Sequence, residues 1–250
     1  MSQNSNKNTN FTIKKLLLIV LVLSPILGIV VSWSFISLLD PDEHSPRVSF
    51  FGNPHEQVYI SWETKEMTTG VVWYGTDKDD LSLSQPVNQE ARIHHVNLTN
   101  LSPDTKYFYE VRIEGEFFGR GEFRTAPLDQ KEFTFGIFAD TQQLIGLGHH
   151  FRLANVLKDK DYAFVACVGD LVEHGFGFID HVDKRFYNNF FKVSSSYMET
   201  IPFVPVVGNH DARGMDLFRD YFINQVDPTD DLFFYSFSWS NVHFTIAHFG

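Results

Sequence analysis

Three short apolar runs in the second half of the chain each end in polar side chains that can bind a metal ion. The first run ends at Asp140, the second at Asp170, and the third at Asn209, which follows Gly208. Carboxylate and amide oxygens are ligands of hard or borderline divalent metals, and two such metals can share a bridging carboxylate. Asp170 is central in the series and is the best candidate for that bridge. The pattern predicts a metal site built from three distant segments.

The segments that carry these side chains are predicted to be buried strands of a mostly parallel sheet. They are short, rich in β-branched and aromatic residues, and span Phe133–Gln142, Phe164–Glu173 and Pro202–Asp211. Open α/β sheets bind their ligands beyond the carboxyl ends of such strands, and neighbouring strands lie about 4.8 Å apart. The polar ends can therefore converge on one metal site. The alternative, that the two aspartates cap helices, does not explain the set of three.

The segments between these strands are predicted to be helices that pack on the sheet. Strand, helix, strand, helix, strand implies right-handed crossovers and a parallel core. A short helix and a β-hairpin that turns at Trp239–Asn241 are expected to follow. The predicted helices are His149–Lys160, His181–Glu199 and Met215–Tyr221, and the hairpin strands are Phe233–Phe237 and Val242–Ala247.

The first half of the chain carries only β signals, from Arg47 to Pro127. Several short strands without a helical period predict a small sandwich. The adjacent His94 and His95 are interpreted as structural, because neighbouring side chains of a strand point to opposite faces. The predicted strands are Val58–Trp62, Val71–Tyr74, His94–Leu98, Tyr107–Ile113 and Gly121–Thr125, with a turn at Met67–Gly70 between the first two.

The N-terminal segment predicts a membrane anchor. In the predicted tail, residues 1–15, the first ten residues are polar and Lys14 and Lys15 come last. Residues 16–39 form an uncharged apolar run that is interrupted only by serines, Pro25 and Gly28. About 20 apolar residues span a bilayer, whereas a cleaved signal peptide has an apolar region of about 7–15 residues. An uncleaved signal anchor is favoured over a secreted, cleaved form. The lysines keep the tail cytoplasmic, so the rest of the chain is expected outside, after a linker over residues 40–46.

Composition narrows the class of protein. A hydrophobic fraction of 43% is typical of a globular chain, and the net charge of −11 argues against a general nucleic-acid binder. The single cysteine, Cys167, lies inside an apolar run and is interpreted as a core residue rather than a nucleophile.

Two sets of motifs resemble known families. Asp140-Thr-Gln142, Gly169-Asp170 and Gly208-Asn-His-Asp211 resemble the signature of the calcineurin-like metallophosphoesterase superfamily. The preceding β region looks like the N-terminal domain of purple acid phosphatases. Its corner with Tyr107, together with Trp62 on an early strand, also resembles a fibronectin type III domain. The resemblance implies an α/β metallophosphoesterase domain over residues 132–250, preceded by an all-β fibronectin III-like sandwich over residues 47–127.

The resemblance also implies roles for the metal-binding residues. Asp140 would bind the first of two metal ions with Gln142 as a second ligand from the same turn, Asp170 would bridge both metals, and Asn209 would bind the second. The ions expected are divalent or trivalent Fe, Mn or Zn. The implied reaction is in-line attack of a metal-activated hydroxide on a phosphoric ester.

Two catalytic residues follow from the same resemblance. His210 would lie beside the phosphate, stabilising its charge or protonating the leaving oxygen, and Asp211 would orient His210. The chain departs from the family at two of these positions and at its end. Glu173 replaces a tyrosine of purple acid phosphatases, Gln142 replaces a histidine, and the later histidine ligands are absent before Gly250, so we expect a C-terminally truncated domain.

The sequence therefore predicts a membrane-anchored, extracytoplasmic metallophosphoesterase that acts on a phosphate ester. Monoesters and diesters remain equally open. The alternative is a catalytically inactive adhesion or sugar-binding surface protein that uses the β-sandwich. An intracellular nucleic-acid phosphodiesterase is disfavoured by the apolar N-terminal segment and the acidic charge balance.

Overall fold

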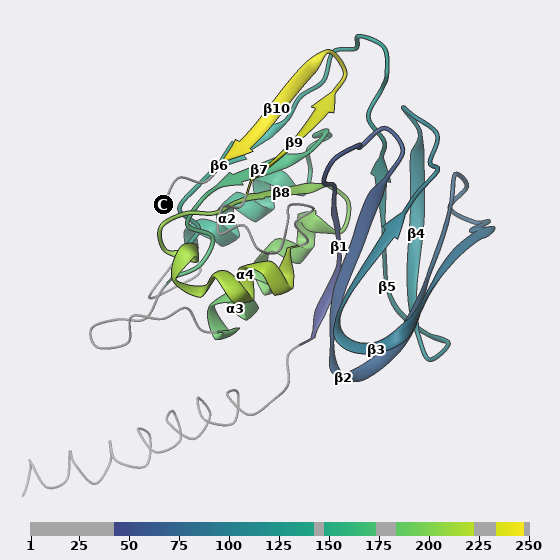
Figure 1. Cartoon of the computed structure of the whole chain (residues 1–250), viewed down its shortest axis with the longest axis horizontal. Helices are drawn as coiled ribbons and strands as arrows, with labels where there is room; N and C mark the ends of the chain where they lie inside the picture. The colour runs from purple at the N-terminus through teal and green to yellow at the C-terminus, as the bar shows by residue number, and fades with distance from the viewer. Residues whose placement is uncertain (1–42, 143–147, 174–183, 223–233, 248–250) are drawn as a thin grey trace, which may run out of the picture. The chain divides into compact units, whose positions relative to one another are not determined.

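A computed structural model describes residues 43–142, 148–173, 184–222 and 234–247, and Figure 1 shows its elements. One sheet has the strand order β5-β4-β2-β1-β8-β7-β6, with β3 paired to β2, and a separate two-stranded sheet contains β9 and β10. The first half of the chain supplies β1 His44–Ser49, β2 Val58–Gly75, β3 Leu83–Leu98, β4 Lys106–Ile113 and β5 Glu116–Arg124.

The long strand β2 folds the first half into two layers. Its first part pairs with β1 and with the end of β3, whereas its second part pairs with β4 and with the start of β3. Register shifts between Glu63 and Gly70 separate the two parts. Such bulges bend a strand and increase its twist, and β2 and β3 curve visibly in Figure 1. The curved strands enclose an apolar core of their own.

The predicted burial of Trp62 and the predicted hydrogen bond of Tyr107 across the sandwich corner are both confirmed. Trp62 is fully buried in this core. The hydroxyl oxygen of Tyr107 accepts a hydrogen bond from the Ser102 N–H at 3.0 Å, which closes the corner across five residues of sequence.

Two other predictions for this half are wrong. The segment 40–46 is not a linker throughout, because β1 begins at His44 and pairs with β2. The segment Met67–Gly70 is not a turn between two strands, because β2 continues through it. In both cases pairing with distant strands decides the conformation, and local turn residues do not.

The second half has the predicted alternation of strands and helices. Its elements are β6 Gly136–Phe138, α2 Gly148–Leu157, β7 Val165–Val168, α3 Lys184–Met198, β8 Phe203–Val206, a 3-10 turn Asp211–Gly214, α4 Met215–Tyr221, β9 Phe234–Trp239 and β10 Val242–Ala247. β6, β7 and β8 are parallel neighbours, and β9 and β10 form the expected antiparallel pair. The parallel core of the sheet is confirmed.

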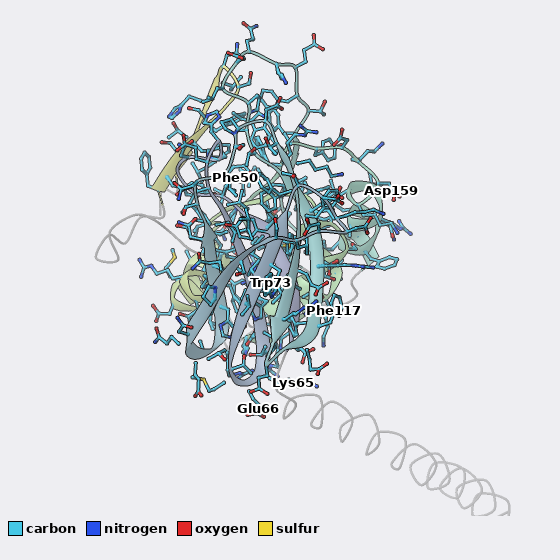
Figure 2. The ribbon with its side chains drawn as sticks, turned by 90° about the vertical axis from the view of Figure 1, so that its right-hand side faces the viewer. Phe50, Lys65, Glu66, Trp73, Phe117 and Asp159 are labelled. Atoms are coloured by element: carbon cyan, nitrogen blue, oxygen red, sulfur yellow. The ribbon has the colours of Figure 1, made fainter. Side chains whose placement is uncertain are left out.

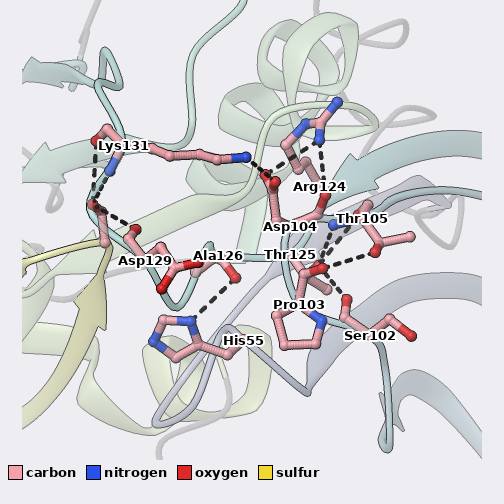
Figure 3. A network of polar contacts seen from close by, with 11 residues as sticks. His55, Ser102, Pro103, Asp104, Thr105, Arg124, Thr125, Ala126, Asp129 and Lys131 are labelled. Atoms are coloured by element: carbon pink, nitrogen blue, oxygen red, sulfur yellow. Dashed lines mark hydrogen bonds and ion pairs between the residues drawn. The ribbon is translucent and has the colours of Figure 1, made fainter.

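The two halves share one sheet, because Ser49 of β1 pairs in parallel with Phe203 of β8. A polar network, shown in Figure 3, fixes the segment that connects them. Asp104 forms ion pairs with Lys131 and Arg124, and His55 Nδ1–H donates to the carbonyl oxygen of Ala126 at 3.1 Å.

Among the described residues, no helix combines the length and the apolar character needed to cross a bilayer. The predicted tail, residues 1–15, and the predicted span, residues 16–39, lie outside the described residues. The membrane anchor therefore stays a prediction.

Candidate metal centre

The loops that follow β6, β7 and β8 meet at one edge of the sheet and are joined by hydrogen bonds. The Asp140 N–H donates to the Gly169 carbonyl at 3.3 Å, and the Gln142 N–H donates to the Asp170 carbonyl at 3.1 Å. The third loop joins through the His210 N–H, which donates to Asp170 Oδ1 at 2.9 Å. The predicted convergence of the three loops is thus confirmed at the level of the backbone, with Asp170 in the middle.

The two aspartates sit in an unusual backbone conformation. Asp140 has φ 58° and Asp170 has φ 54°, both in the left-handed region that non-glycine residues rarely adopt. Each such residue costs on the order of 1–3 kcal/mol and persists only where the surroundings impose it. The strain coincides with the two candidate carboxylate ligands.

Gly208 permits the close approach of the second and third loops. A Cβ atom at this position would lie 2.2 Å from both the backbone N and Oδ1 of Asp170. No side chain fits there without displacing the Asp170 backbone. The glycine that ends the third apolar run is therefore needed for packing against Asp170, beyond the turn that the sequence predicts.

Asp211 is completely buried directly below this edge. Its carboxylate accepts hydrogen bonds from the backbone N–H groups of Leu171, Val172 and Gly208, at 2.9 to 3.2 Å. Burial raises the pKa of the Asp211 carboxyl to about 6, although these hydrogen bonds act in the opposite direction. Asp211 connects the second loop to the third.

The predicted contact between Asp211 and the His210 ring is replaced by another one. His210 Nδ1 lies 2.8 Å from Glu173 Oε1, so the ring donates its Nδ1–H to that carboxylate. Glu173 was singled out in the sequence as a departure from the tyrosine of purple acid phosphatases, but nothing in its spacing indicates His210 as its partner.

The residues present fit a metal centre in part. Gln142 Oε1 is buried and has no hydrogen-bond partner among the residues that the structure describes. A buried amide oxygen without a donor is costly, and a cation would satisfy it. The described parts of the chain contain no group of three or more histidine, cysteine or acidic side chains arranged to hold a metal ion. The assignments of Asp140, Gln142, Asp170 and Asn209 as ligands, and of His210 and Asp211 as catalytic, therefore stay predictions.

The histidines of the β-rich half have structural contacts, as predicted. His94 stacks on Trp62 with ring centroids 4.8 Å apart. His95 contacts the Ser61 hydroxyl and donates Nε2–H to the carbonyl oxygen of Asp220. Neither is part of the candidate centre. The predicted core role of Cys167 agrees with its complete burial, which raises the pKa of its thiol well above the usual value.

Comparisons with known proteins agree with both motif resemblances. Residues 44–125 match the family model "Purple acid Phosphatase, N-terminal domain", and residues 133–250 match "Calcineurin-like phosphoesterase". Two curated relatives from Mycobacterium tuberculosis, the uncharacterized proteins MT2654 (strain CDC 1551 / Oshkosh) and Rv2577 (strain ATCC 25618 / H37Rv), are each 28% identical over 156 residues. These alignments cover 54% of this chain and 29% of each relative, so the chain spans less than a third of their length.

A solved structure supports the fold. The structure of PhoD superposes with a TM-score of 0.66 at 12% sequence identity, covering 80% of this chain and 50% of PhoD. Solved fibronectin type III domains, such as those of chicken CNTN1, reach a TM-score of only 0.28, so the fibronectin likeness stays a prediction. The first part of the chain therefore matches the purple acid phosphatase N-terminal domain, and the second part matches the calcineurin-like phosphoesterase family.

Proposed function

We propose that the second half of the chain hydrolyses phosphoric esters in a metal-dependent reaction. The observation that carries this proposal is the hydrogen-bonded junction of the three loops at Asp170, within a domain of the calcineurin-like phosphoesterase family. The junction holds the oxygen ligands at one edge of the sheet. We propose Asp140, Gln142, Asp170 and Asn209 as ligands of two metal ions.

The chain's own residues would divide the remaining work. Two bound metal ions supply a hydroxide nucleophile and offset the charge of the phosphate. We assign His210 the role of stabilising the phosphate charge or protonating the leaving oxygen, with its ring oriented by the contact between Nδ1 and Glu173. Asp211 would not contact the substrate. It would hold the second and third loops in place, because its carboxylate accepts hydrogen bonds from backbone N–H groups of both loops.

The side of the membrane and the substrate are further parts of this proposal. The apolar segment 16–39 and the lysines before it favour a domain outside the cytoplasm, where it meets an external phosphate ester. Both monoesters and diesters fit the proposed chemistry. The alternative is a domain without catalytic activity whose sandwich serves for binding, and the experiment below separates the two.

The substitution Asp170→Asn tests the proposed bridge. Asn keeps an oxygen that can accept from the His210 N–H, so we expect an unchanged unfolding temperature. Loss of the charged bridge should reduce metal-dependent hydrolysis of an aryl phosphate by at least about 100-fold, measured in the full-length protein with added Mn²⁺, Zn²⁺ or Fe²⁺. The exposed Asp159→Asn is the matched control and should behave as wild type. Wild-type turnover in Asp170→Asn would remove the proposed role of Asp170.

A further inference from the structure

The outer face of the β-rich half exposes aromatic rings beside planar charged groups. Trp73 of β2 is 38% exposed and lies between Ser84 of β3 and Glu110 of β4 in the strand register. Two residues after Glu110 on β4, Arg112 pairs with Phe117 of β5, which is 59% exposed. Figure 2 looks onto this half and labels Trp73 and Phe117. We call this surface the Trp73 face.

The Trp73 face is hollowed into an elongated track. A hollow of 350 Å³ is lined by Trp73, Lys78, Glu110 and Arg112, among others. A second hollow, of 430 Å³, is also lined by Trp73 and Arg112 and extends toward the start of β3. A third, of 520 Å³, shares Lys78 and Glu110 with the first and continues to Glu199. Because neighbouring hollows share lining residues, an extended molecule can lie across all three with Trp73 near the middle.

The charges of the central hollow cancel within the protein. Arg112 Nε–H donates to Glu110 Oε1 at 2.6 Å, and Lys78 Nζ lies 3.9 Å from the carboxylate of Asp79. The central hollow thus has two cations and two anions, already paired. The central hollow therefore offers no excess charge of one sign to an anionic or a cationic polymer. It does offer hydrogen-bond donors and acceptors side by side on a rigid sheet.

We propose that the Trp73 face binds a neutral polysaccharide. The indole ring of Trp73 would stack on the apolar C–H face of a sugar ring, since aromatic side chains give a large contact area with a polar edge. The Arg112–Glu110 pair would supply a donor and an acceptor to neighbouring sugar hydroxyls. The length of the track suits several consecutive sugars.

The proposed site is separate from the candidate metal centre. The track ends at Glu199 and Thr200, directly before β8, whereas Asn209 follows the opposite end of that strand. Binding of a polysaccharide should therefore leave phosphoesterase activity unchanged. The inference does not depend on the proposed function and would hold for a catalytically inactive protein.

Affinity gel electrophoresis of the protein tests the proposal, with gels that contain soluble mixed-linkage glucan, xyloglucan, galactomannan or xylan. We expect at least one neutral polymer to retard the wild-type protein and Trp73→Ala to weaken that retardation at least about tenfold. Trp73→Phe should keep most of the affinity. The control is Phe151→Ala, which removes a more exposed aromatic ring, 58% against 38% for Trp73, from α2. Thermal unfolding of each variant confirms that the fold is retained.

Four results would overturn the proposal. The first is the absence of retardation by every neutral polymer, and the second is equal retardation of the wild-type and Trp73→Ala proteins. The third is a Trp73-dependent preference for another class of polymer, for which anionic alginate and extended gelatin chains serve as comparison gels. If binding falls equally in Trp73→Ala and Phe151→Ala, the effect is not specific to the Trp73 face, and the proposal is wrong.

Discussion

Two carboxylates, Glu63 and Asp211, are both completely buried, but they are stabilised in different ways. Glu63 of β2 lies among cations, forming ion pairs with Lys184 of α3 and with Arg92 of β3 at 3.5 Å. His44 Nε2 lies 3.3 Å from Glu63 as well. Asp211 instead accepts only from backbone amides among its described hydrogen bonds.

The difference follows from what each carboxylate must hold in place. Lysine and arginine side chains are long and adjust their position, so the Glu63 cluster can connect a strand of the first half to a helix of the second. Backbone amides are fixed by their loops, so Asp211 sets the distance between the loops after β7 and β8. Amides carry no full charge, and burial accordingly raises the pKa of Asp211 to about 6.

Of the variants compared, a substitution of Glu63 should change the free energy of unfolding most. Removing one partner of a buried ion cluster leaves uncompensated charge, so Glu63→Gln should lower the free energy of unfolding by about 3–5 kcal/mol in chemical denaturation. The control is Glu122→Gln, which removes the partner of Lys106 in an exposed pair, 2.7 Å apart, and should cost less than about 1 kcal/mol. Equal costs for the two variants would contradict the proposed importance of the cluster.

Acid pH should reveal a second large effect. Burial is the main cause that lowers the pKa of His44, in the Glu63 cluster, to about 3, and of His150, in the second half, to about 4. As pH falls below about 6.5, the unfolded chain takes up protons that the folded chain does not, so stability is lost. His150→Gln should remove about 3 kcal/mol of that loss between pH 6.5 and 4.

Unfolding by urea at a series of pH values measures this loss. The exposed His149→Gln, next to His150 in the same helix, is the matched control and should keep the wild-type profile. A His150→Gln profile that runs parallel to that of the wild type would show that His150 does not titrate between the folded and unfolded states.

Asp211 should show a smaller effect than Glu63. Asn has one acceptor oxygen in place of two, so Asp211→Asn leaves at least one buried N–H unpaired and should cost about 1–3 kcal/mol by chemical denaturation. The exposed Asp161→Asn serves as its control, with a cost within about 0.5 kcal/mol. If Asp211→Asn costs as much as Glu63→Gln, the distinction between amide and cation partners fails.

A substitution of Glu173 should have the smallest effect, and this effect should appear in the activation free energy of catalysis. Glu173→Gln keeps an oxygen that accepts from His210 Nδ1 but loses the charge, so kcat for an aryl phosphate should fall about tenfold with little change in KM. An unchanged kcat would show that the contact does not position His210 for catalysis.

Local patterns in the sequence correctly predict several elements. α4 spans Met215–Tyr221 and β10 spans Val242–Ala247, as their apolar spacing indicates. The breaks at Asp140, Asp170 and Gly208 place three loops at one sheet edge, because the strands before them are parallel neighbours. These features depend on spacing within each segment and on the chirality of the crossovers.

The features that the sequence does not predict depend on distant partners. β2 runs through its turn-like residues because β3 pairs with it on both sides of them and at Thr68, and β4 pairs with it from Gly70 onward. The amide partner of Asp211 at Leu171 lies 40 positions away, and the carboxylate partner of His210, Glu173, lies 37 positions away. No periodicity connects residues so far apart, and the adjacency of His210 and Asp211 favours a contact that the folded chain does not form.

The parallel pair between β1 and β8 has a practical consequence for handling the phosphoesterase half by itself. A chain that starts after residue 125 would leave one side of β8 without its neighbour and present open N–H and C=O groups at the middle of the native sheet. Such an edge is a template for pairing with other molecules. Expression of the shortened half is therefore expected to yield aggregates, whereas in the chain with both halves β1 covers this side of β8.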